Sequence, residues 1–152
     1  MSKSIESNPD HDNFSFVDSE HDILEFWERE AIFQQSLDQT KDGAPYIFYD
    51  GPPFATGLPH HGHLVGSILK DVVPRYFTMQ GRYVQRRFGW DCHGLPIELN
   101  VEKKHGKNSD LVKNKETFQN ACKEYAESQI NNQLNDFKRL GILGDWDNPY
   151  KS

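Results

Sequence analysis

A proline- and glycine-rich loop that ends in two closely spaced histidines constrains the fold of this chain more than any other feature. The loop runs from Gly51 to Pro59, between a short apolar and aromatic segment, Tyr46–Asp50, and a helical pattern that starts at His60. An apolar segment without polar alternation is typical of a strand buried on both faces of a parallel sheet. The sequence therefore predicts a buried strand, a stiff loop and a helix in succession.

The two histidines, His60 and His63, are three residues apart. Side chains at this spacing share one helix face, and a helix start offers unpaired N–H groups and partial positive charge. Imidazole N–H donors placed there can stabilise charge that develops on the α-phosphate of ATP. An isolated pair of this kind is more often satisfied by backbone or solvent, and the glycine-rich context favours the nucleotide hypothesis. A metal site is the weaker interpretation because no third ligand lies nearby, so we expect no metal ligands here.

A second strand is predicted after the helix, which extends from His60 to about Gln80 and is expected to kink or break at Pro74. The strand is placed at Arg82–Phe88, and strand, helix and strand at this spacing form a parallel, right-handed βαβ unit. The predicted fold class is α/β, with a Rossmann-like parallel sheet. The helix side chains expected to face this sheet are Leu64, Ile68, Leu69, Val72 and Val73.

A second unusual loop, Gly89–Glu98, follows the second predicted strand. Ligands of open parallel sheets bind beyond the carboxyl ends of the strands, so the two loops are expected to face one crevice. Asp91, beside Trp90, is suited to hold an ammonium group next to an aromatic wall. An equally supported alternative is a turn capped by the aspartate, with the tryptophan in the core.

Two further helices are predicted, one from Asp18 to the Asp42–Gly43 stop and one from Asn114 to Leu140. Residues 1–15 are expected to form a flexible tail, and residues 16–152 a nucleotide-binding domain. The apolar stripe of the long helix consists of Phe118, Cys122, Tyr125, Ile130, Leu134 and Phe137.

The composition of the chain argues against several classes of protein. A chain of 152 residues with a net charge of −6 has the size of one domain and no broadly basic surface for nucleic acid. Arg82, Arg86 and Arg87 are better interpreted as structural ion pairs than as phosphate ligands. No apolar run approaches membrane-spanning length, and the N-terminus lacks the apolar core of a signal peptide. Cys92 and Cys122 lack zinc spacing, so a reducing, cytoplasmic setting is expected.

Two long motifs make the chain resemble the class I aminoacyl-tRNA synthetases, and among them the isoleucyl-tRNA synthetases. Residues 49–63, Tyr-Asp-Gly-Pro-Pro-Phe-Ala-Thr-Gly-Leu-Pro-His-His-Gly-His, resemble the family's first signature and its leading loop. Residues 89–98, Gly-Trp-Asp-Cys-His-Gly-Leu-Pro-Ile-Glu, resemble the second active-site loop of the isoleucine enzymes. The ending at residues 140–150 is also similar, so the resemblance covers about residues 16–152.

The resemblance implies a reaction in which isoleucine and ATP, with Mg²⁺, give isoleucyl-adenylate and pyrophosphate, followed by transfer of the aminoacyl group to tRNA(Ile). His60 and His63 resemble the histidines that stabilise the α-phosphate transition state, and Gly62 the glycine that lets adenine approach. Asp91 resembles the carboxylate that binds the substrate's α-ammonium group. The remaining implied site residues are Gly51, Thr56 and Gly57 for ATP, and Pro52 and Trp90 for the amino acid.

The chain departs from the family in length. The second signature, Lys-Met-Ser-Lys-Ser, is absent, as are the editing and anticodon-binding regions, so residues 16–152 are expected to be the N-terminal part of a class I catalytic domain and inactive alone. The resemblance thus implies that half of the sheet is missing, and we expect an exposed edge strand and little cover for the apolar stripe of the long helix. One alternative is a nucleotidylyltransferase with the same histidine signature, which the loop at residues 89–98 argues against. Another is a non-catalytic fragment that binds nucleotide or a partner.

Overall fold

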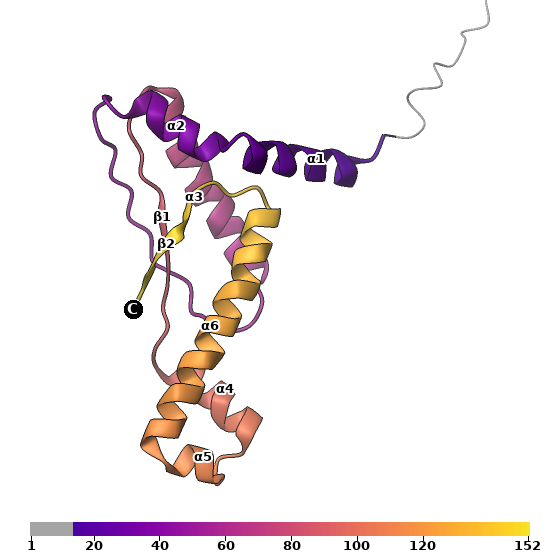
Figure 1. Ribbon diagram of the computed structural model, residues 1–152, viewed down its shortest axis with the longest axis vertical. Coiled ribbons are helices and arrows are strands. Elements are labelled where there is room, and N and C mark those ends of the chain that lie inside the picture. The colour runs from indigo at the N-terminus through magenta and orange to yellow at the C-terminus, as the bar shows by residue number, and fades with distance from the viewer. Residues whose placement is uncertain (1–13) are drawn as a thin grey trace, which may run out of the picture. The chain divides into compact units, whose positions relative to one another are not determined.

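The computed structural model of the protein describes residues 14–152 and is drawn in Figure 1. The chain divides into two compact units, residues 1–32 and residues 33–152. Most of the predicted tail, residues 1–13, lies outside the described residues. Of its last two residues, Ser15 caps the first helix, since its Oγ accepts a hydrogen bond of 3.2 Å from Asp18 N.

The first helix, α1 (Phe16–Arg29), carries Asp18 in its first turn and Arg29 in its last, as the helix dipole favours. The prediction of one continuous helix up to the Asp42–Gly43 stop is wrong. The chain is interrupted at Ala31, whose φ of 49° is left-handed and cannot continue a right-handed helix. A second helix, α2 (Ile32–Thr40), begins directly afterwards.

In the second unit, the segment around residues 44–54 runs parallel to the segment around residues 83–91. Isolated parallel bridges join Pro45 to Tyr83 and Phe54 to Asp91. The parallel direction is as predicted, but Tyr46–Asp50 forms no regular strand. The prediction of burial on both faces is wrong, because Tyr49 is 90% exposed. No strand covers the outer edge of this segment within the described residues, which matches the exposed edge that we expected.

The regular sheet is a parallel pair, β1 (Arg87–Trp90) and β2 (Asp145–Lys151), which lie side by side in Figure 1. β1 overlaps only the end of the predicted strand at Arg82–Phe88, and β2 was not predicted, because its sequence is polar and contains a proline. Among the described residues this pair and the bridges above form a small parallel sheet within a mixed helix and strand fold. The paired residues are Arg87 with Asp145, Gly89 with Tyr150, and Trp90 with Lys151.

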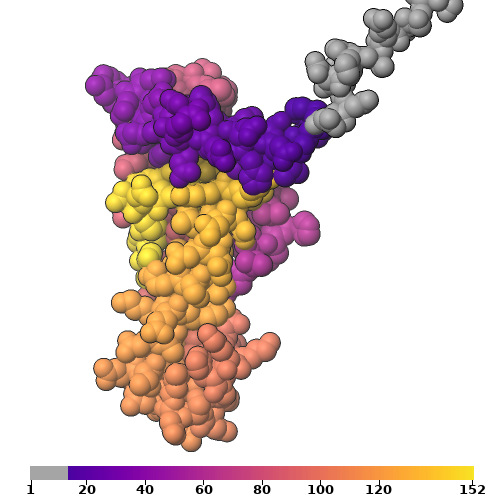
Figure 2. All heavy atoms as spheres, turned by 45° about the vertical axis from the view of Figure 1, so that its right-hand side comes forward, coloured from indigo at the N-terminus to yellow at the C-terminus, as the bar shows by residue number. Residues whose placement is uncertain are grey.

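Four helices complete the second unit. α3 (His61–Met79) matches its predicted range and continues through Pro74 without a break, and α6 (Lys115–Arg139), capped by Asn114, also matches. Two helices were not predicted, α4 (Leu95–His105) and α5 (Asp110–Lys113). Gly94, with a φ of 93°, ends the second loop and begins α4 earlier than expected. The space-filling view in Figure 2 shows the atoms of α4 and α5 gathered against the start of α6.

The core lies between α6, β1 and the histidine loop. The expectation that the α6 stripe lacks cover is wrong, because Ile130 and Phe137 are buried against Ala55, Trp90 and Ile142. The uncovered stripe is instead on α3. Three of its side chains that were expected to face the sheet are exposed, since no regular strand forms beneath them: Ile68, Leu69 and Val72.

Within residues 14–152, none of the helices has the length and apolar character that a membrane crossing requires.

Candidate functional site

Backbone hydrogen bonds hold the two unusual loops side by side. Ala55 N donates to Asp91 O, and Asp91 N donates to Pro53 O, each at 2.9 Å. The loop after the first extended segment and the loop after β1 therefore share one site, as the sequence predicted. In Figure 1 the first loop leads into the N-terminal end of α3, and the second runs from β1 to α4.

The two histidines form a reciprocal cap on α3. His60 Nδ1 accepts from Gly62 N at 3.1 Å, and His60 N donates to His63 Nδ1 at 3.3 Å. Because both Nδ1 atoms are acceptors, the hydrogen of each neutral ring is on Nε2. The ring centroids are 3.9 Å apart. The pair can therefore present two adjacent Nε2–H donors.

Glycine is required at position 62 for this arrangement. A Cβ atom there would lie 3.0 Å from His60 Cε1 and 3.1 Å from His60 Nδ1. Those contacts are tighter than side chains normally tolerate, so a larger residue would displace the His60 ring from its capping position.

The surroundings of His63 favour its neutral form. Burial lowers the pKa of His63 from its usual 6.5, and the nearby charges of His60 and Lys70 lower it further. The Lys70 ammonium forms an ion pair with the Asp50 carboxylate, which ties α3 to the residue just before Gly51.

A pocket of about 120 Å³ lies between the histidine helix, the first loop and β1. Glycines form much of its wall, and His63, Lys70 and Asp50 supply its polar groups. Small residues leave room for a ligand to approach the backbone closely. The lining residues are Asp50, Gly51, Pro53, Gly62, His63, Gly66, Ser67, Lys70, Phe88, Gly89, Trp90 and Phe137.

The Asp91 carboxylate is held by two donors at the end of β1. Its Oδ1 accepts from His93 N at 3.3 Å and from Ser152 Oγ at 3.2 Å. The Ser152 hydroxyl is itself oriented, because it accepts from Cys92 N at 2.9 Å. These contacts fix the carboxylate through Oδ1, and a carboxylate oxygen retains the capacity to accept from a cation.

One side chain of α6 contacts both loops. Gln133 is 1% exposed, and its Oε1 accepts from Trp90 Nε1 at 3.0 Å. Its Nε2 donates to Phe54 O and Gly57 O, each at 3.0 Å, and lies 3.4 Å from Thr56 O. The carbonyl groups of the first loop and the indole of the second are therefore joined through a single buried amide.

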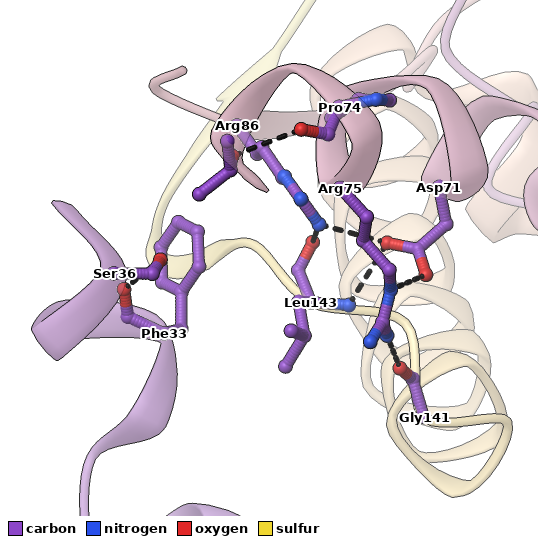
Figure 3. A network of polar contacts seen from close by, with 9 residues as sticks. Phe33, Ser36, Asp71, Pro74, Arg75, Arg86, Gly141 and Leu143 are labelled. Carbon is purple, nitrogen blue, oxygen red and sulfur yellow. Dashed lines mark hydrogen bonds and ion pairs between the residues drawn. The ribbon is translucent and has the colours of Figure 1, made fainter. Parts of the chain in front are cut away.

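A polar network fixes the other half of α3. Figure 3 shows the Asp71 carboxylate between two guanidinium groups, with Arg75 Nε at 2.5 Å and Arg86 Nη1 at 2.9 Å. Asp71 also accepts from Leu143 N at 3.3 Å, while Arg75 donates to Gly141 O at 2.5 Å. Burial lowers the pKa of Arg86 to about 10, and Asp71 opposes this shift, so the guanidinium remains charged at neutral pH. The interpretation of Arg86 as a structural ion pair is confirmed.

Comparison with known proteins assigns the family. A model of the tRNA synthetases class I (I, L, M and V) matches residues 22–152, which contain both loops and both histidines. The chain belongs to this family. Among its relatives, the isoleucine--tRNA ligase of Treponema pallidum (strain Nichols) is 47% identical over 140 residues, which are 90% of this chain and 13% of that protein.

Relatives from two other organisms give the same result. Isoleucine--tRNA ligase 2 of Pseudomonas fluorescens is 47% identical over 141 residues, which cover 90% of this chain and 14% of that protein. The isoleucine--tRNA ligase of Tetrahymena thermophila is 42% identical over 153 residues, or 99% of this chain and 14% of that protein. The class I synthetase chain thus spans about one seventh of the length of these relatives.

In this synthetase chain, the predicted site residues fall into two groups. Gly51, Gly62, His63 and Trp90 line the pocket, and His60 adjoins it through the His63 ring. The others lie on the same two loops but outside the pocket lining: Pro52, Thr56, Gly57 and Asp91. Trp90 is 1% exposed and belongs to the core, which supports the alternative interpretation of that side chain.

The sequence analysis missed Gln133, Ser152 and the Asp50–Lys70 pair. Gln133 could have been found, because it is a polar residue on the apolar stripe of α6, between Ile130 and Phe137. Ser152 could not, since nothing in the sequence places it beside Asp91.

Within the described part of the chain, no group of three or more His, Cys, Asp or Glu side chains is arranged to hold a metal ion.

Proposed function

We propose that this chain forms part of the catalytic domain of an isoleucine--tRNA ligase and carries the histidine half of its amino-acid activation site. The observation that supports the proposal is the direct pairing of the two loops, of which one carries an oriented carboxylate and the other leads to two imidazole donors. The name of the relatives and the isoleucine-type second loop support the choice of amino acid.

In the proposed reaction, a carboxylate oxygen of isoleucine forms a bond to the α-phosphorus of ATP. The bond from that phosphorus to the bridging oxygen breaks, and pyrophosphate leaves with its electron pair. No nucleophile on the protein is needed, so the chain contributes by positioning and by stabilising charge. Mg²⁺ accompanies the ATP phosphates.

The histidine pair is suited to the phosphate side of this reaction. The Nε2–H groups of His60 and His63 are free of the capping bonds made by Nδ1, and both lie at the positive end of α3. Negative charge grows on the α-phosphate oxygens in the transition state, and these donors would stabilise it most there. The glycines of the first loop and of the signature, Gly51, Gly57 and Gly62, leave room for the nucleotide; Thr56 supplies a hydroxyl beside them.

Asp91 is suited to the amino-acid side. Its carboxylate is oriented by Ser152 and His93 and keeps acceptor capacity for the α-ammonium group of isoleucine. Pro52 precedes Pro53, whose carbonyl accepts from Asp91 N, and would form part of the wall near the side chain, with Trp90 behind it in the core.

The second step, transfer of the aminoacyl group to tRNA(Ile), belongs to the proposal as an activity of a complete ligase. A cytoplasmic setting is also proposed. Cys92 and Cys122 are free, which is the state that a reducing compartment maintains.

The proposal is tested in a chimera in which residues 22–152 replace the matching part of the Treponema pallidum isoleucine--tRNA ligase. ATP–pyrophosphate exchange is measured with isoleucine, valine and leucine in parallel. We expect exchange with isoleucine at a kcat/KM well above the other two. Exchange that depends on leucine instead would contradict the amino-acid assignment, and a chimera that binds ATP without exchange would favour a non-catalytic module.

A further inference from the structure

The buried amide of Gln133 makes hydrogen bonds with both its nitrogen and its oxygen beside the proposed site. Its nitrogen carries two hydrogens, which match the two carbonyl contacts at 3.0 Å, and its oxygen meets the single hydrogen of the Trp90 indole. The orientation of the amide is determined by these partners, because an indole N–H only donates and carbonyls only accept. The side chain is 1% exposed, so water cannot replace these partners without opening the core.

The position of Gln133 links the two halves of the proposed reaction. Phe54 and Gly57 belong to the loop that leads to the histidines, whereas Trp90 precedes Asp91 in the loop proposed to hold the ammonium group. A buried donor or acceptor that loses its partner costs more than the bond contributes, so neither loop can shift without a penalty in free energy. Through Gln133, α6 therefore helps to fix the distance between the two loops, in addition to the backbone hydrogen bonds that join the loops directly.

We propose that Gln133 is a positioning residue that couples the ATP loop to the amino-acid loop of the activation site. The inference rests on the proposed function of those loops. Gln133 touches no reacting atom in this arrangement; it acts through the carbonyls of the first loop and through the Trp90 indole. Binding at one loop is then expected to depend on the integrity of the other.

The physical part of the proposal is tested in the 152-residue chain by NMR. The substitution Gln133→Met keeps the length of the side chain and removes every hydrogen bond, and Gln129→Met is the matched control one turn earlier on the same helix. We expect Q133M, but not Q129M, to speed solvent exchange of the Trp90 indole N–H by about tenfold or more and to shift the amide signals of Ala55 to Leu58. Equal exchange in both variants would overturn the coupling.

The functional part is tested in the chimera by ATP–pyrophosphate exchange. We expect Q133M to raise KM for both isoleucine and ATP by about tenfold. Trp90→Phe, which removes the indole N–H together with part of the buried ring system, should raise KM for isoleucine and leave KM for ATP nearly unchanged. The double variant should resemble Q133M, because the two residues act through one hydrogen bond.

A side chain with only a structural role would give a different pattern. It would lower the active fraction, and hence kcat, with both KM values unchanged, and this outcome would overturn the proposal even if the NMR coupling were present. Gln133→Glu adds a check with pH. When protonated, its carboxyl can donate one bond to the loop carbonyls, and when ionised it repels them. KM for ATP in Q133E should therefore rise with pH, whereas the defect of Q133M should not; parallel profiles would count against the proposal.

An unsubstituted chimera without isoleucine-dependent exchange would be a failure of the proposed function, and this inference would fall with it. Normal exchange in the chimera combined with unaltered KM values in Q133M would remove the inference alone.

Discussion

Asp71→Asn is expected to destabilise the second unit strongly, because it removes the only negative charge in the network drawn in Figure 3. The Asp71 side chain is 11% exposed and that of Arg86 is 8% exposed, so both charges lie largely out of water. The amide keeps an acceptor for Leu143 N–H but leaves the Arg86 guanidinium without an anionic partner there. With Asp71 present the pKa of Arg86 is about 10, so the guanidinium whose partner is removed is charged at neutral pH.

The size of the effect follows from this burial. Breaking a buried ion pair by removing one partner costs about 3–5 kcal/mol. The retained hydrogen bond and the more exposed Arg75 place this case near the lower limit, at about 3 kcal/mol. With a urea m-value of about 1.5–2 kcal/mol/M, the unfolding midpoint should fall by about 1.5–2 M.

The assay is urea unfolding of the 152-residue chain, followed by circular dichroism at neutral pH. Glu127→Gln is the matched control, since it makes the same carboxylate-to-amide change in the exposed Glu127–Lys151 pair. Exposed pairs contribute about 0–1 kcal/mol, so the midpoint of E127Q should move by less than about 0.5 M. Equal midpoint shifts in D71N and E127Q would refute the reasoning, because burial would then make no difference to the pair.

Three further predictions concern the proposed site. In NMR titration of the chain, His63 should have a pKa below 6.5. Because the folded pKa is then below the unfolded one, lowering the pH from the unfolded towards the folded pKa destabilises the fold. A titration midpoint at or above 6.5 would contradict this prediction. In the chimera, Asp91→Asn should raise KM for isoleucine by roughly tenfold or more while KM for ATP changes little, and the reverse pattern would make the assignment wrong. Ser152→Ala should raise KM for isoleucine by a smaller factor, and Ser152→Thr should restore it, because the hydroxyl orients the Asp91 carboxylate. Identical KM values in S152A and S152T would exclude that role.

The starts of the helices at His60 and Asn114 were predictable because the residues that determine a helix start are its immediate neighbours in the sequence. The helix start at His60 follows from the glycine and proline content before it, and the long helix from Asn114 follows from its cap and apolar spacing. The pairing of the two loops was also predictable, since both follow extended segments of one parallel unit.

The features that were predicted wrongly or missed depend on contacts between residues that are distant in the sequence. Tyr46–Asp50 looks like a buried strand by composition, yet the described residues supply no neighbour for its outer edge, and Tyr49 is exposed. β2 is polar and forms only because β1 lies beside it. Ala31 gave no warning of its left-handed backbone, since alanine is the strongest helix former. Ser152 reaches Asp91 across 61 residues of sequence, which no periodicity can reveal. Gln133 stands out as a polar residue on the apolar stripe of α6, but that position does not reveal its loop partner 76 residues away.

The central claim is that His60 and His63 act on the α-phosphate in the transition state. Its most direct test is the rate of isoleucine-dependent ATP–pyrophosphate exchange in the chimera, with and without His60→Ala and His63→Ala. Losing one such donor typically costs ~10²–10³ in rate, so each variant should lose kcat by about that factor while isoleucine binding changes little. An unchanged kcat in both variants would contradict the account.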